Sequence, residues 1–404
     1  MRMYLAAIGS RGDYEPFRTL AEAASRAGHD VHFAHTADFA ADNDAPYSSH
    51  LLPGSFEAML SEGFSFTKSV ASYRTVIKPM LEGIYRTSTT QIVSLKPDVV
   101  VYHPKVMTAA TAAHYVGALA VMAELVPTLT PTKDFPPAGL PLRLPPQLNR
   151  ASYAIVAAGL SSFGDPAKKL ADDLGVSRST PDMSLCPESP AIVPQPADWP
   201  PHATITGPWL SSTSSDDDPQ LDAFLSGKPT VYAGFGSMND GESHARARAT
   251  TILSAARHLG YQTLFVTGWG GLSIDETDAQ APDVLIRQSV HHESVFPRVT
   301  LAIHHGGAGT TQRALLSATP SVILPFLADQ PWWANRLHSQ HLGPPAVRKR
   351  NTNPATLISA LRMAADAQDT VTSAAEAMSK ENGPEASIRL IEESVGRRNP
   401  DAPS

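Results

Sequence analysis

The chain has 404 residues, of which 42% are hydrophobic and 18% are charged. This length favours two domains, since a domain usually takes about 100–200 residues, and the composition excludes a disordered or coiled-coil chain. With 32 Lys and Arg against 39 Asp and Glu, the net charge of −7 offers no basic footprint for a nucleic acid. The single Cys186 excludes an intramolecular disulfide, and a strand-like run stands where a signal peptide would, so we expect a cytoplasmic protein.

The first half of the chain alternates short apolar runs with longer stretches, a pattern typical of βαβ units and a parallel sheet. We expect strands over residues 3–8, 31–35, 98–103 and 118–125. A helix is expected over 15–27, beginning with Pro16 at its first position and ending at Gly28. Residues 105–126 are rich in Ala and Val, but His114 and Glu124 interrupt them, which favours a buried helix and strand over a transmembrane helix.

The second half repeats this pattern. We expect strands over 230–234, 262–267, 284–287, 300–304 and 321–325, with helices over 243–259, 309–318 and 331–341. Between the halves, Thr206–Pro219 has the Ser, Pro and Gly content of a linker. Its run Asp216–Asp218 is interpreted as solvated charge, with a metal site as the weaker alternative. The sequence therefore predicts an α/β fold of two Rossmann-like, doubly wound domains.

A second proline-rich stretch runs from Pro127 to Pro146. It is too long for a routine connection, and loops of this kind often serve as lids or binding loops. We expect it to roof a ligand pocket, although plain disorder would explain its composition equally well.

The strongest chemical motif is the stretch 301–311, Leu-Ala-Ile-His-His-Gly-Gly-Ala-Gly-Thr-Thr. A buried strand ends in two histidines, turns through three glycines within four residues, and starts a helix with two threonines. Glycine lets backbone N–H groups approach a ligand closely, and a helix N-terminus attracts anions. The motif therefore predicts a phosphate cradle, with a purely structural glycine turn as the alternative.

Other phosphate and metal motifs are not supported. The cradle has no Walker lysine, and neither Gly234-Phe-Gly236 nor Gly307-Ala-Gly309 continues to a third glycine three residues on, so dinucleotide redox binding is not indicated. Adjacent histidines on a strand face opposite sides, so His304 and His305 cannot chelate one metal. We expect no metal.

Two further motifs follow predicted strands, where open α/β sheets bind their ligands. Asp329 and Gln330 come after the strand at 321–325 and suit hydrogen bonding to vicinal sugar hydroxyls, although Asp329 could equally cap the next helix. Asp13 lies on the turn after the first strand and could accept a hydroxyl proton as a general base, or else cap its helix. The turn Gly234–Ser237 could add backbone amides and the Ser237 hydroxyl to the cradle.

In this order, the motifs Gly9-Ser-Arg-Gly-Asp-x-Glu-Pro16, His304-His-Gly-Gly-Ala-Gly-Thr-Thr311 and Asp329-Gln330-Pro331 resemble those of the GT-B nucleotide-sugar-dependent glycosyltransferases. More narrowly, they are similar to the branch of glycopeptide-antibiotic and mycobacterial glycolipid glycosyltransferases and sterol glucosyltransferases. The resemblance covers both halves, with a poorly matched region from about 40 to 200. It implies an acceptor domain over 1–207, a linker over 208–221, a donor domain over 222–384, and a C-terminal helix over 385–400 that packs back on the first domain.

The resemblance also implies residue roles. Asp13 would be the catalytic base, and Asp329 and Gln330 would contact the transferred sugar. The donor diphosphate would lie among Ser10, Arg11, Gly12, Ser237, His305, Gly307, Ala308, Gly309, Thr310 and Thr311, and the nucleobase beside Ser289, Val290 and His292. Plant small-molecule glucosyltransferases have a ribose-binding glutamate where this chain has Arg313, so both UDP- and dTDP-sugars stay open as donors.

The implied activity is metal-independent, inverting transfer of a hexose to a hydroxyl of a hydrophobic acceptor such as a natural product, sterol, terpenoid or lipid, with no cofactor besides the nucleotide sugar. The proline-rich loop and a group of aromatic residues could form an apolar acceptor pocket, although scattered Phe and Tyr residues more often belong to a core; the group is Phe56, Phe64, Phe66, Tyr73 and Tyr85. A nucleotide-sugar epimerase or hydrolase, and a non-catalytic nucleotide-sugar-binding partner, are the alternatives. The run Arg348–Arg350 is interpreted as a solvated surface, with peripheral contact to an anionic membrane left open, and the chain as a monomer or homodimer.

Overall fold

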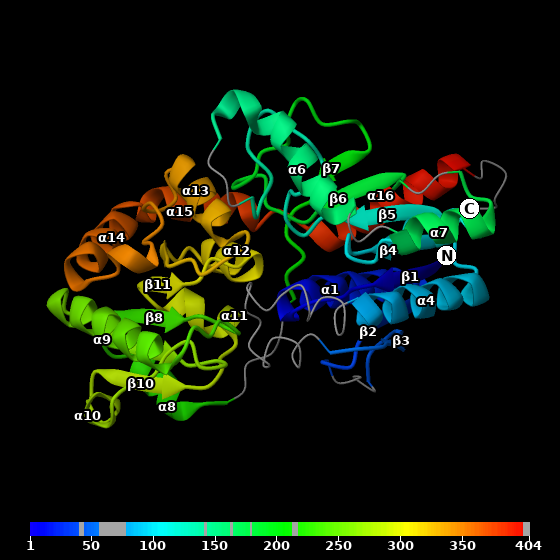
Figure 1. Cartoon of the computed structure of the whole chain (residues 1–404). Coiled ribbons are helices and arrows are strands. Elements are labelled where there is room, and N and C mark those ends of the chain that lie inside the picture. The colour runs from blue at the N-terminus through cyan, green and yellow to red at the C-terminus, as the bar shows by residue number, and fades with distance from the viewer. Residues whose placement is uncertain are drawn as a thin grey trace.

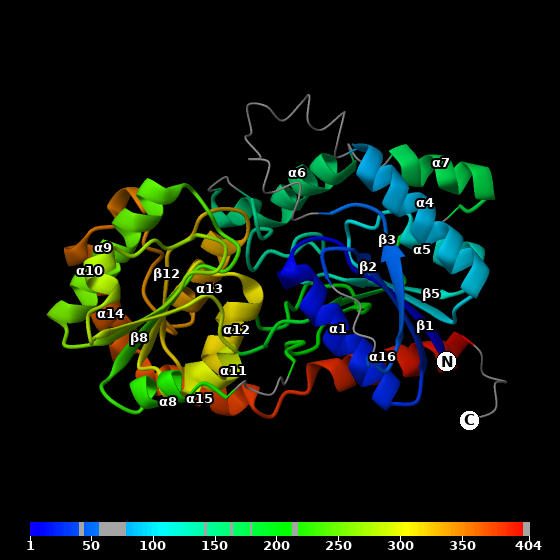
Figure 2. The same cartoon turned by 90° about the horizontal axis from the view of Figure 1, so that it is seen from below.

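The computed structural model of the chain describes residues 1–39, 44–55, 78–140, 144–161, 165–177, 180–211 and 217–398. Two α/β domains, each a parallel sheet with helices packed against it, lie side by side (Figures 1 and 2). The aromatic residues Phe56, Phe64, Phe66 and Tyr73 of the expected acceptor pocket lie outside the described residues, as does Asp216.

In the described part of the chain, the first sheet has the strand order β3-β2-β1-β4-β5-β6-β7, with all pairs parallel. Its central strands are buried along their whole length, as expected for a parallel sheet covered on both faces. The strands are β1 (Arg2–Ala6), β2 (Asp30–Thr36), β3 (Ser48–Leu52), β4 (Val99–Tyr102), β5 (Leu119–Ala123), β6 (Met183–Cys186) and β7 (Ala203–Ile205). The helices are α1 (Arg11–Arg26), α4 (Lys78–Leu95), α5 (Ala109–Tyr115), α6 (Asn149–Ser161) and α7 (Asp165–Leu174).

The second sheet has the order β10-β9-β8-β11-β12 and is also parallel throughout its described strands. Its strands are β8 (Thr230–Gly234), β9 (Gln262–Val266), β10 (Val284–Arg287), β11 (Leu301–His304) and β12 (Ser321–Ile323). Its helices are α8 (Pro219–Leu225), α9 (Glu242–His258), α10 (Glu276–Ala279), α11 (His292–Val295), α12 (Ala308–Leu316), α13 (Gln330–Ser339), α14 (Pro354–Asp366) and α15 (Gln368–Met378). Both sheets therefore have the doubly wound topology that the sequence predicts.

The last helix, α16 (Gly383–Arg398), returns to the first sheet. Ile388 and Ile391 belong to the core between that sheet and α1. The Trp209 indole N–H donates to Ser387 Oγ at 2.9 Å, and Arg398 pairs with Asp182 at 2.6 Å. Figure 2 shows α16 beside α1 under the first domain.

An apolar cluster joins the two halves. Phe135 and Ala138 of the proline-rich segment pack with Trp332 and Trp333 of α13. The Trp332 indole N–H donates to the Pro136 carbonyl at 3.0 Å, and the Phe135 and Trp332 rings meet edge-on at 5.5 Å. The described part of this segment is thus ordered against the second domain, beside the start of α13.

Three expectations about local structure need correction. Helix α1 begins at Arg11, not at Pro16, because Ser10 and Asp13 close its first turn and Pro16 lies inside the helix. Asp218 is not simply a solvated linker charge, since it caps α8 and pairs with Arg287 at 2.7 Å. Tyr85 is only 4% exposed and packs in the first domain's core, so it does not line a pocket.

Candidate active site at the domain boundary

Asp13 lies in the first turn of α1, directly after the central strand β1. The Ser10 N–H donates to Asp13 Oδ2 at 2.7 Å, and the Ser10 hydroxyl donates to the same oxygen at 3.0 Å. The carboxylate therefore closes the helix start, which is the structural role that the sequence left open beside the catalytic one.

Gly9 makes room for this carboxylate. It has a φ of +138°, and a Cβ on it would lie 2.1 Å from Asp13 Oδ2 and 2.9 Å from Lys105 Nζ. No side chain fits there without moving both groups, so the turn requires glycine for steric as well as conformational reasons.

The other carboxylate oxygen, Oδ1, contacts two residues that the sequence analysis did not single out. His103 Nε2 lies 3.1 Å and Lys105 Nζ lies 3.0 Å from it. The Lys105 backbone N–H donates to His103 Nδ1 at 3.1 Å, so Nδ1 is the acceptor and Nε2 carries the proton given to Asp13. Both residues follow β4, which pairs with β1 in the sheet.

The charges around Asp13 decide its ionisation. Burial alone would raise the pKa of Asp13, but the Lys105 charge and the His103 hydrogen bond outweigh it and hold this pKa well below its usual range. Burial lowers the pKa of His103, and the Lys105 charge acts in the same direction. At neutral pH, Asp13 is therefore an anion beside a neutral His103.

The predicted cradle follows β11, with Gly307 as the N-cap of α12. The Gly306 N–H donates to His304 Nδ1 at 3.0 Å, and a Cβ on Gly306, whose φ is +90°, would lie 2.6 Å from Ile323. This tight turn exposes the first-turn N–H groups of α12, which a helix cannot satisfy internally. A Cβ on Gly309 would meet no described atom within 4 Å, so the space in front of the helix start is open.

His305 lies between the cradle and the turn after β8. A Cβ on Gly307 would be 2.6 Å from its Nε2, and one on Gly236 would be 3.5 Å from its Cε1. The residue after Gly236 is Ser237, so the Gly234–Ser237 turn lies against the cradle. Burial lowers the pKa of His305 to about 4, so at neutral pH the neutral ring can donate one N–H to an anion.

Thr310 and Thr311 differ in what a ligand can reach. Thr311 is 1% exposed, its N–H donates to the Gly307 carbonyl at 2.9 Å, and its hydroxyl oxygen is buried without a hydrogen-bond partner among the described residues. Its hydroxyl is thus enclosed within the domain, and its contact with a diphosphate stays a prediction. Thr310, half-buried at the helix start, is the member of the pair that a ligand can reach.

Asp329 and Gln330 begin α13. The Trp333 indole N–H donates to Asp329 Oδ2 at 3.0 Å, so the carboxylate is held by a buried tryptophan and not by the helix N–H groups. Burial raises the pKa of Asp329, and the Asp13 charge raises it further. Gln330 Oε1 accepts the N–H groups of Phe326 and Leu327 at 2.7 and 3.1 Å, and its amide nitrogen donates one N–H to Met238 Sδ at 3.3 Å. The second N–H of this amide is the group that a ligand could bind.

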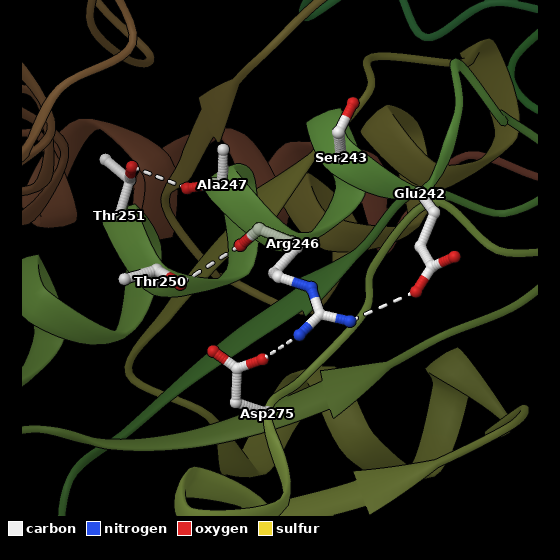
Figure 3. Close-up of a pocket in the computed structure, with 7 residues that line it drawn as sticks. All are labelled: Glu242, Ser243, Arg246, Ala247, Thr250, Thr251 and Asp275. Carbon is white, nitrogen blue, oxygen red and sulfur yellow. Dashed lines mark hydrogen bonds and ion pairs between the residues drawn. The ribbon is translucent and has the colours of Figure 1, made fainter.

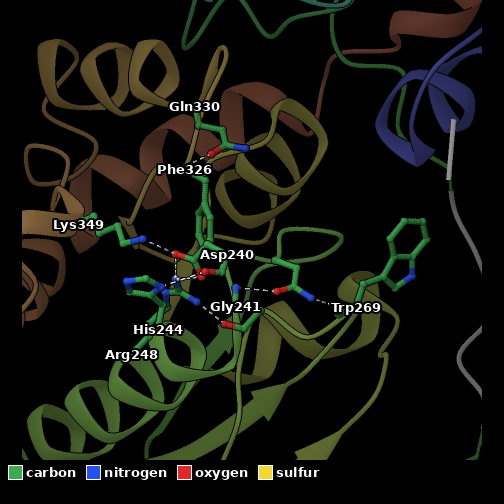
Figure 4. Close-up of polar contacts among 10 residues, drawn as sticks. Asp240, Gly241, His244, Arg248, Trp269, Phe326, Gln330 and Lys349 are labelled. Carbon is green, nitrogen blue, oxygen red and sulfur yellow. Dashed lines mark hydrogen bonds and ion pairs between the residues drawn. The ribbon is translucent and has the colours of Figure 1, made fainter. Parts of the chain in front are cut away.

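A charged cluster braces the loop that carries Asp329. Asp240 pairs with Arg248 at 2.7 Å and with Lys349 at 3.1 Å (Figure 4). The Arg248 guanidinium lies over the Phe326 ring, 4.4 Å from its centre, and the Phe326 N–H is bound by Gln330. Lys349 of the basic run is thus part of this cluster. This cluster supports the loop before α13 through the contact between Arg248 and Phe326.

The predicted nucleobase residues lie after β10. Ser289 is exposed and Val290 is half-buried, whereas His292 is bound by the Tyr232 hydroxyl at 2.9 Å and stacks on Phe296 at 4.6 Å. His292 therefore supports this edge through packing. Trp269 is 49% exposed, and its backbone N–H donates to the Gly236 carbonyl at 3.1 Å. The sequence analysis did not predict Trp269 as a site residue, although an aromatic residue between two glycines after a strand is a usable signal. Figure 4 shows its ring pointing away from the Asp240 cluster.

The two halves of the site face each other across the domain boundary. Asp13 and Lys105 of the first domain lie within electrostatic range of Asp329, since their charges shift its pKa in opposite directions. The pKa of His292 is lowered to about 4, first by burial and then by nearby positive charges. One of these charges is Arg11 at the start of α1, which therefore also acts across the domain boundary. Figure 2 shows the start of α1 pointing toward α12.

Arg313 occupies the position where the resemblance would place a ribose-binding glutamate. Its guanidinium donates to the Ser211 carbonyl and lies 4.0 Å from Glu293. Its interactions are therefore with the linker and with α11, and both UDP- and dTDP-sugars stay open as donors.

Other features of the described residues do not compete with this site. A pocket of 680 Å³ lies on the face of α9, where Arg246 pairs with Glu242 and Asp275 (Figure 3), and none of the predicted motifs lines it. No group of three His, Cys, Asp or Glu side chains in the described ranges could hold a metal ion. No helix in the same ranges is long and apolar enough to cross a membrane.

Two facing Rossmann-like domains, joined by a C-terminal helix that returns to the first, define the GT-B fold of glycosyltransferases. No protein-family model matches the chain. A solved relative supports the fold: the SsfS6 glycosyltransferase of Streptomyces sp. SF2575, complexed with thymidine diphosphate, has a TM-score of 0.64 and 18% identity, covering 97% of this chain and 99% of that one.

Sequence relatives fall in the branch that the motifs indicate. A sterol 3-beta-glucosyltransferase of Arabidopsis thaliana is 26% identical over 422 residues, covering 96% of this chain and 67% of that protein. The vancomycin aglycone glucosyltransferase of Amycolatopsis orientalis is 28% identical over 435 residues, covering 99% of both chains. The chain thus spans about two thirds of the length of the plant relative and nearly all of the bacterial one. It groups with the sterol and glycopeptide-antibiotic glucosyltransferases.

Proposed function

We propose that this chain is an inverting glycosyltransferase that moves a hexose from a UDP- or dTDP-sugar to a hydroxyl of a hydrophobic acceptor. The observation that carries the proposal is the position of Asp13, an anion at the domain boundary whose charge reaches Asp329 in the other domain. The relatives act on a sterol and on a glycopeptide aglycone, as their names state, which supports an acceptor with a large apolar surface.

In this proposal, the acceptor oxygen attacks the anomeric carbon as the bond to the diphosphate breaks, and Asp13 takes the hydroxyl proton. An ionised aspartate is far too weak a base to deprotonate an alcohol beforehand, so proton transfer accompanies the attack. A single displacement inverts the anomeric carbon, so an α-linked donor gives a β-glycoside.

The leaving diphosphate would be held at the start of α12. Its charge meets the N–H groups of Ala308, Gly309 and Thr310, the positive end of the helix dipole, and the His305 ring. Ser10, Arg11 and Gly12 would approach the same diphosphate from α1, because Arg11 already acts on His292 across the boundary. Thr311 would support this helix from within.

The sugar and the nucleoside would extend in opposite directions from the diphosphate. Asp329 and the amide nitrogen of Gln330 would contact the sugar hydroxyls, since both open α13 opposite Asp13. Ser289 and Val290 would border the base, with Trp269 available for stacking. One neighbour in fold is complexed with thymidine diphosphate, which supports a nucleotide at this edge. Residues 1–207 would bind the acceptor and residues 222–384 the donor.

The test is the Asp13→Asn substitution, which keeps the side chain's shape but removes the base. We expect turnover of a UDP- or dTDP-sugar with hydrophobic acceptors to fall by at least about 10²-fold, while calorimetry finds donor affinity nearly unchanged. Mass spectrometry and NMR would identify a β-glycoside in the parent. Equal turnover in the variant would refute the role of Asp13, and sugar release or epimerisation without an acceptor would favour a hydrolase or epimerase.

A further inference from the structure

The four hydrogen bonds to Asp13 fill its acceptor capacity. A carboxylate offers about four lone-pair positions. In this structure they are taken by the Ser10 N–H and hydroxyl on Oδ2, and by His103 and Lys105 on Oδ1. An acceptor hydroxyl can reach the carboxylate only after one of these donors leaves.

The structure distinguishes which donor can leave. Oδ2 lies against the backbone of the Gly9 turn, where a Cβ would be only 2.1 Å away, so a ligand cannot approach that oxygen. On Oδ1, the His103 side chain is 9% exposed and is fixed through Nδ1 by the Lys105 backbone N–H. The Lys105 side chain is 43% exposed and ends in a flexible ammonium. The Ser10 hydroxyl is exposed as well, but it lies on Oδ2. Of the two donors on Oδ1, Lys105 is therefore the one that is both accessible and mobile.

We propose that Lys105 is a gate on the base: its ammonium occupies Asp13 Oδ1 in the free protein and is displaced by the acceptor hydroxyl. This inference rests on the proposed function. The hydroxyl O–H takes the place of Nζ–H on Oδ1, and its proton passes to that oxygen during attack. His103 stays in place as a positioning residue, because its Nδ1 is occupied and the neutral ring has no free acceptor for a proton. The displaced ammonium remains near the boundary, where Asp329 is the other carboxylate that its charge reaches.

The gate has a consequence for basicity. While Lys105 is bound, its positive charge makes Asp13 a poor proton acceptor, and its departure restores basicity at the moment when the hydroxyl arrives. The charged and titratable groups that face Asp13 are Lys105 and His103 from the loop after β4 and Asp329 from the start of α13. Removing Lys105 leaves His103 to oppose both burial and the like charge of Asp329.

The first arm of the test measures Asp13 without any substrate. The variants are Lys105→Met, which removes the charge, Lys105→Arg, which keeps it, and Lys78→Met as a control on the exposed start of α4. Carbodiimide and an amine nucleophile at pH 5 to 6 label protonated carboxyls, and peptide mass spectrometry quantifies Asp13. We expect at least fivefold more labelling of Asp13 in Lys105→Met than in the parent and the other two variants. Equal labelling would overturn the proposal.

The second arm measures the pH dependence of kcat/KM for the acceptor. In Lys105→Met the acidic limb should move up by about one pH unit or more, with rates above the limb equal to or higher than those of the parent. Lys105→Arg and Lys78→Met should keep the limb of the parent. An unmoved limb, or a loss of donor affinity in Lys105→Met, would mean that Lys105 is not a gate. If the parent transfers no sugar, the proposed function fails, and the labelling arm alone decides whether Lys105 controls Asp13.

Discussion

The buried hydroxyl of Thr311 leads to a prediction in which stability and ligand affinity respond differently. Thr311 is 1% exposed in the first turns of α12, and its Oγ1 has no hydrogen-bond partner among the described residues. Valine has the same shape with a methyl group in place of the hydroxyl. Thr311→Val therefore removes a buried, unsatisfied polar atom without opening a cavity.

The expected magnitude follows from the cost of that atom. Leaving a hydroxyl buried without a partner costs about 1–3 kcal/mol, so Thr311→Val should raise the free energy of unfolding of the second domain by about 1 kcal/mol or more. Both residues are β-branched, so helix propensity changes little. Because this hydroxyl faces the interior, the affinity for a nucleoside diphosphate should remain within about twofold.

Thr310→Val provides the matched comparison on the same helix. Losing one hydrogen bond to a charged phosphate costs about 1.5–3 kcal/mol, which corresponds to about a 10- to 100-fold weaker Kd. Urea unfolding measures the stability of both variants, and calorimetry with UDP and dTDP measures their affinity. If Thr311→Val weakens nucleotide binding as much as Thr310→Val, or lowers stability, the placement of the two hydroxyls is wrong.

Two other substitutions test the turn beside Asp13 and a contact between the two domains. Gly9→Ala places a Cβ 2.1 Å from Asp13 Oδ2 and should lower kcat more than tenfold with donor affinity retained. Gly28 also has a positive φ, +84°, but no described atom lies within 4 Å of its Cβ position, so Gly28→Ala should leave kinetics unchanged; equal kinetics in both variants would contradict the geometry. Glu381 accepts the Ser189 hydroxyl at 2.8 Å between the domains, and burial raises its pKa from 4.5 to about 7. The stability that this shift contributes is present below pH 4.5 and is lost as pH rises through 7. The unfolding midpoint of the parent should therefore fall over this pH range, and Glu381→Gln should make that fall smaller. An equal fall in the variant would exclude Glu381 as the cause of the pH dependence.

Most of the strands that the sequence predicted are buried along most of their length. Residues 99–102, Val-Val-Val-Tyr, and 119–123, Leu-Ala-Val-Met-Ala, are buried throughout and stand out as continuous apolar runs. The strand β3, Ser-Ser-His-Leu-Leu, is an edge strand with mostly exposed side chains, and β7 has only three residues. Neither leaves a pattern that distinguishes it from a loop, and both were missed. The strand β6, Met-Ser-Leu-Cys, was missed too although it is buried throughout, because four residues with a central serine make too short an apolar run.

The start of α1 illustrates a conflict between two local signals. Proline at the first position of a helix is a common arrangement, and this favoured a start at Pro16. The Ser10 and Asp13 pair is also a helix-start signal, since the two residues close a first turn together. The helix begins at the capping pair, because its first turn satisfies both the N–H and the hydroxyl of Ser10 through Asp13. The N–H that Pro16 lacks inside α1 does not prevent this start.

The residues around Asp13 depend on information that a single sequence does not contain. Asp13 could be identified because it follows the first strand. His103 and Lys105 follow the strand at 98–103, but nothing in the sequence states which strands are neighbours. Only the parallel pairing of β1 with β4, with Ala6 opposite Tyr102, brings the two loops together. The burial of Thr311 could not be predicted for a related reason, since the inner face of α12 is defined by packing.

The topology explains why the site lies where it does. In each sheet the chain order reverses between two neighbouring strands, β1 and β4 in the first and β8 and β11 in the second, and ligands of open α/β sheets bind beyond the carboxyl ends at such points. Asp13 follows β1 and Lys105 follows β4, while Ser237 follows β8 and His305 follows β11. The two reversal points meet at the domain boundary, so in the proposed function one would supply the base with its gate and the other would supply the diphosphate cradle. The pocket on α9 is at neither point, and substitutions there should therefore leave both donor affinity and turnover unaffected.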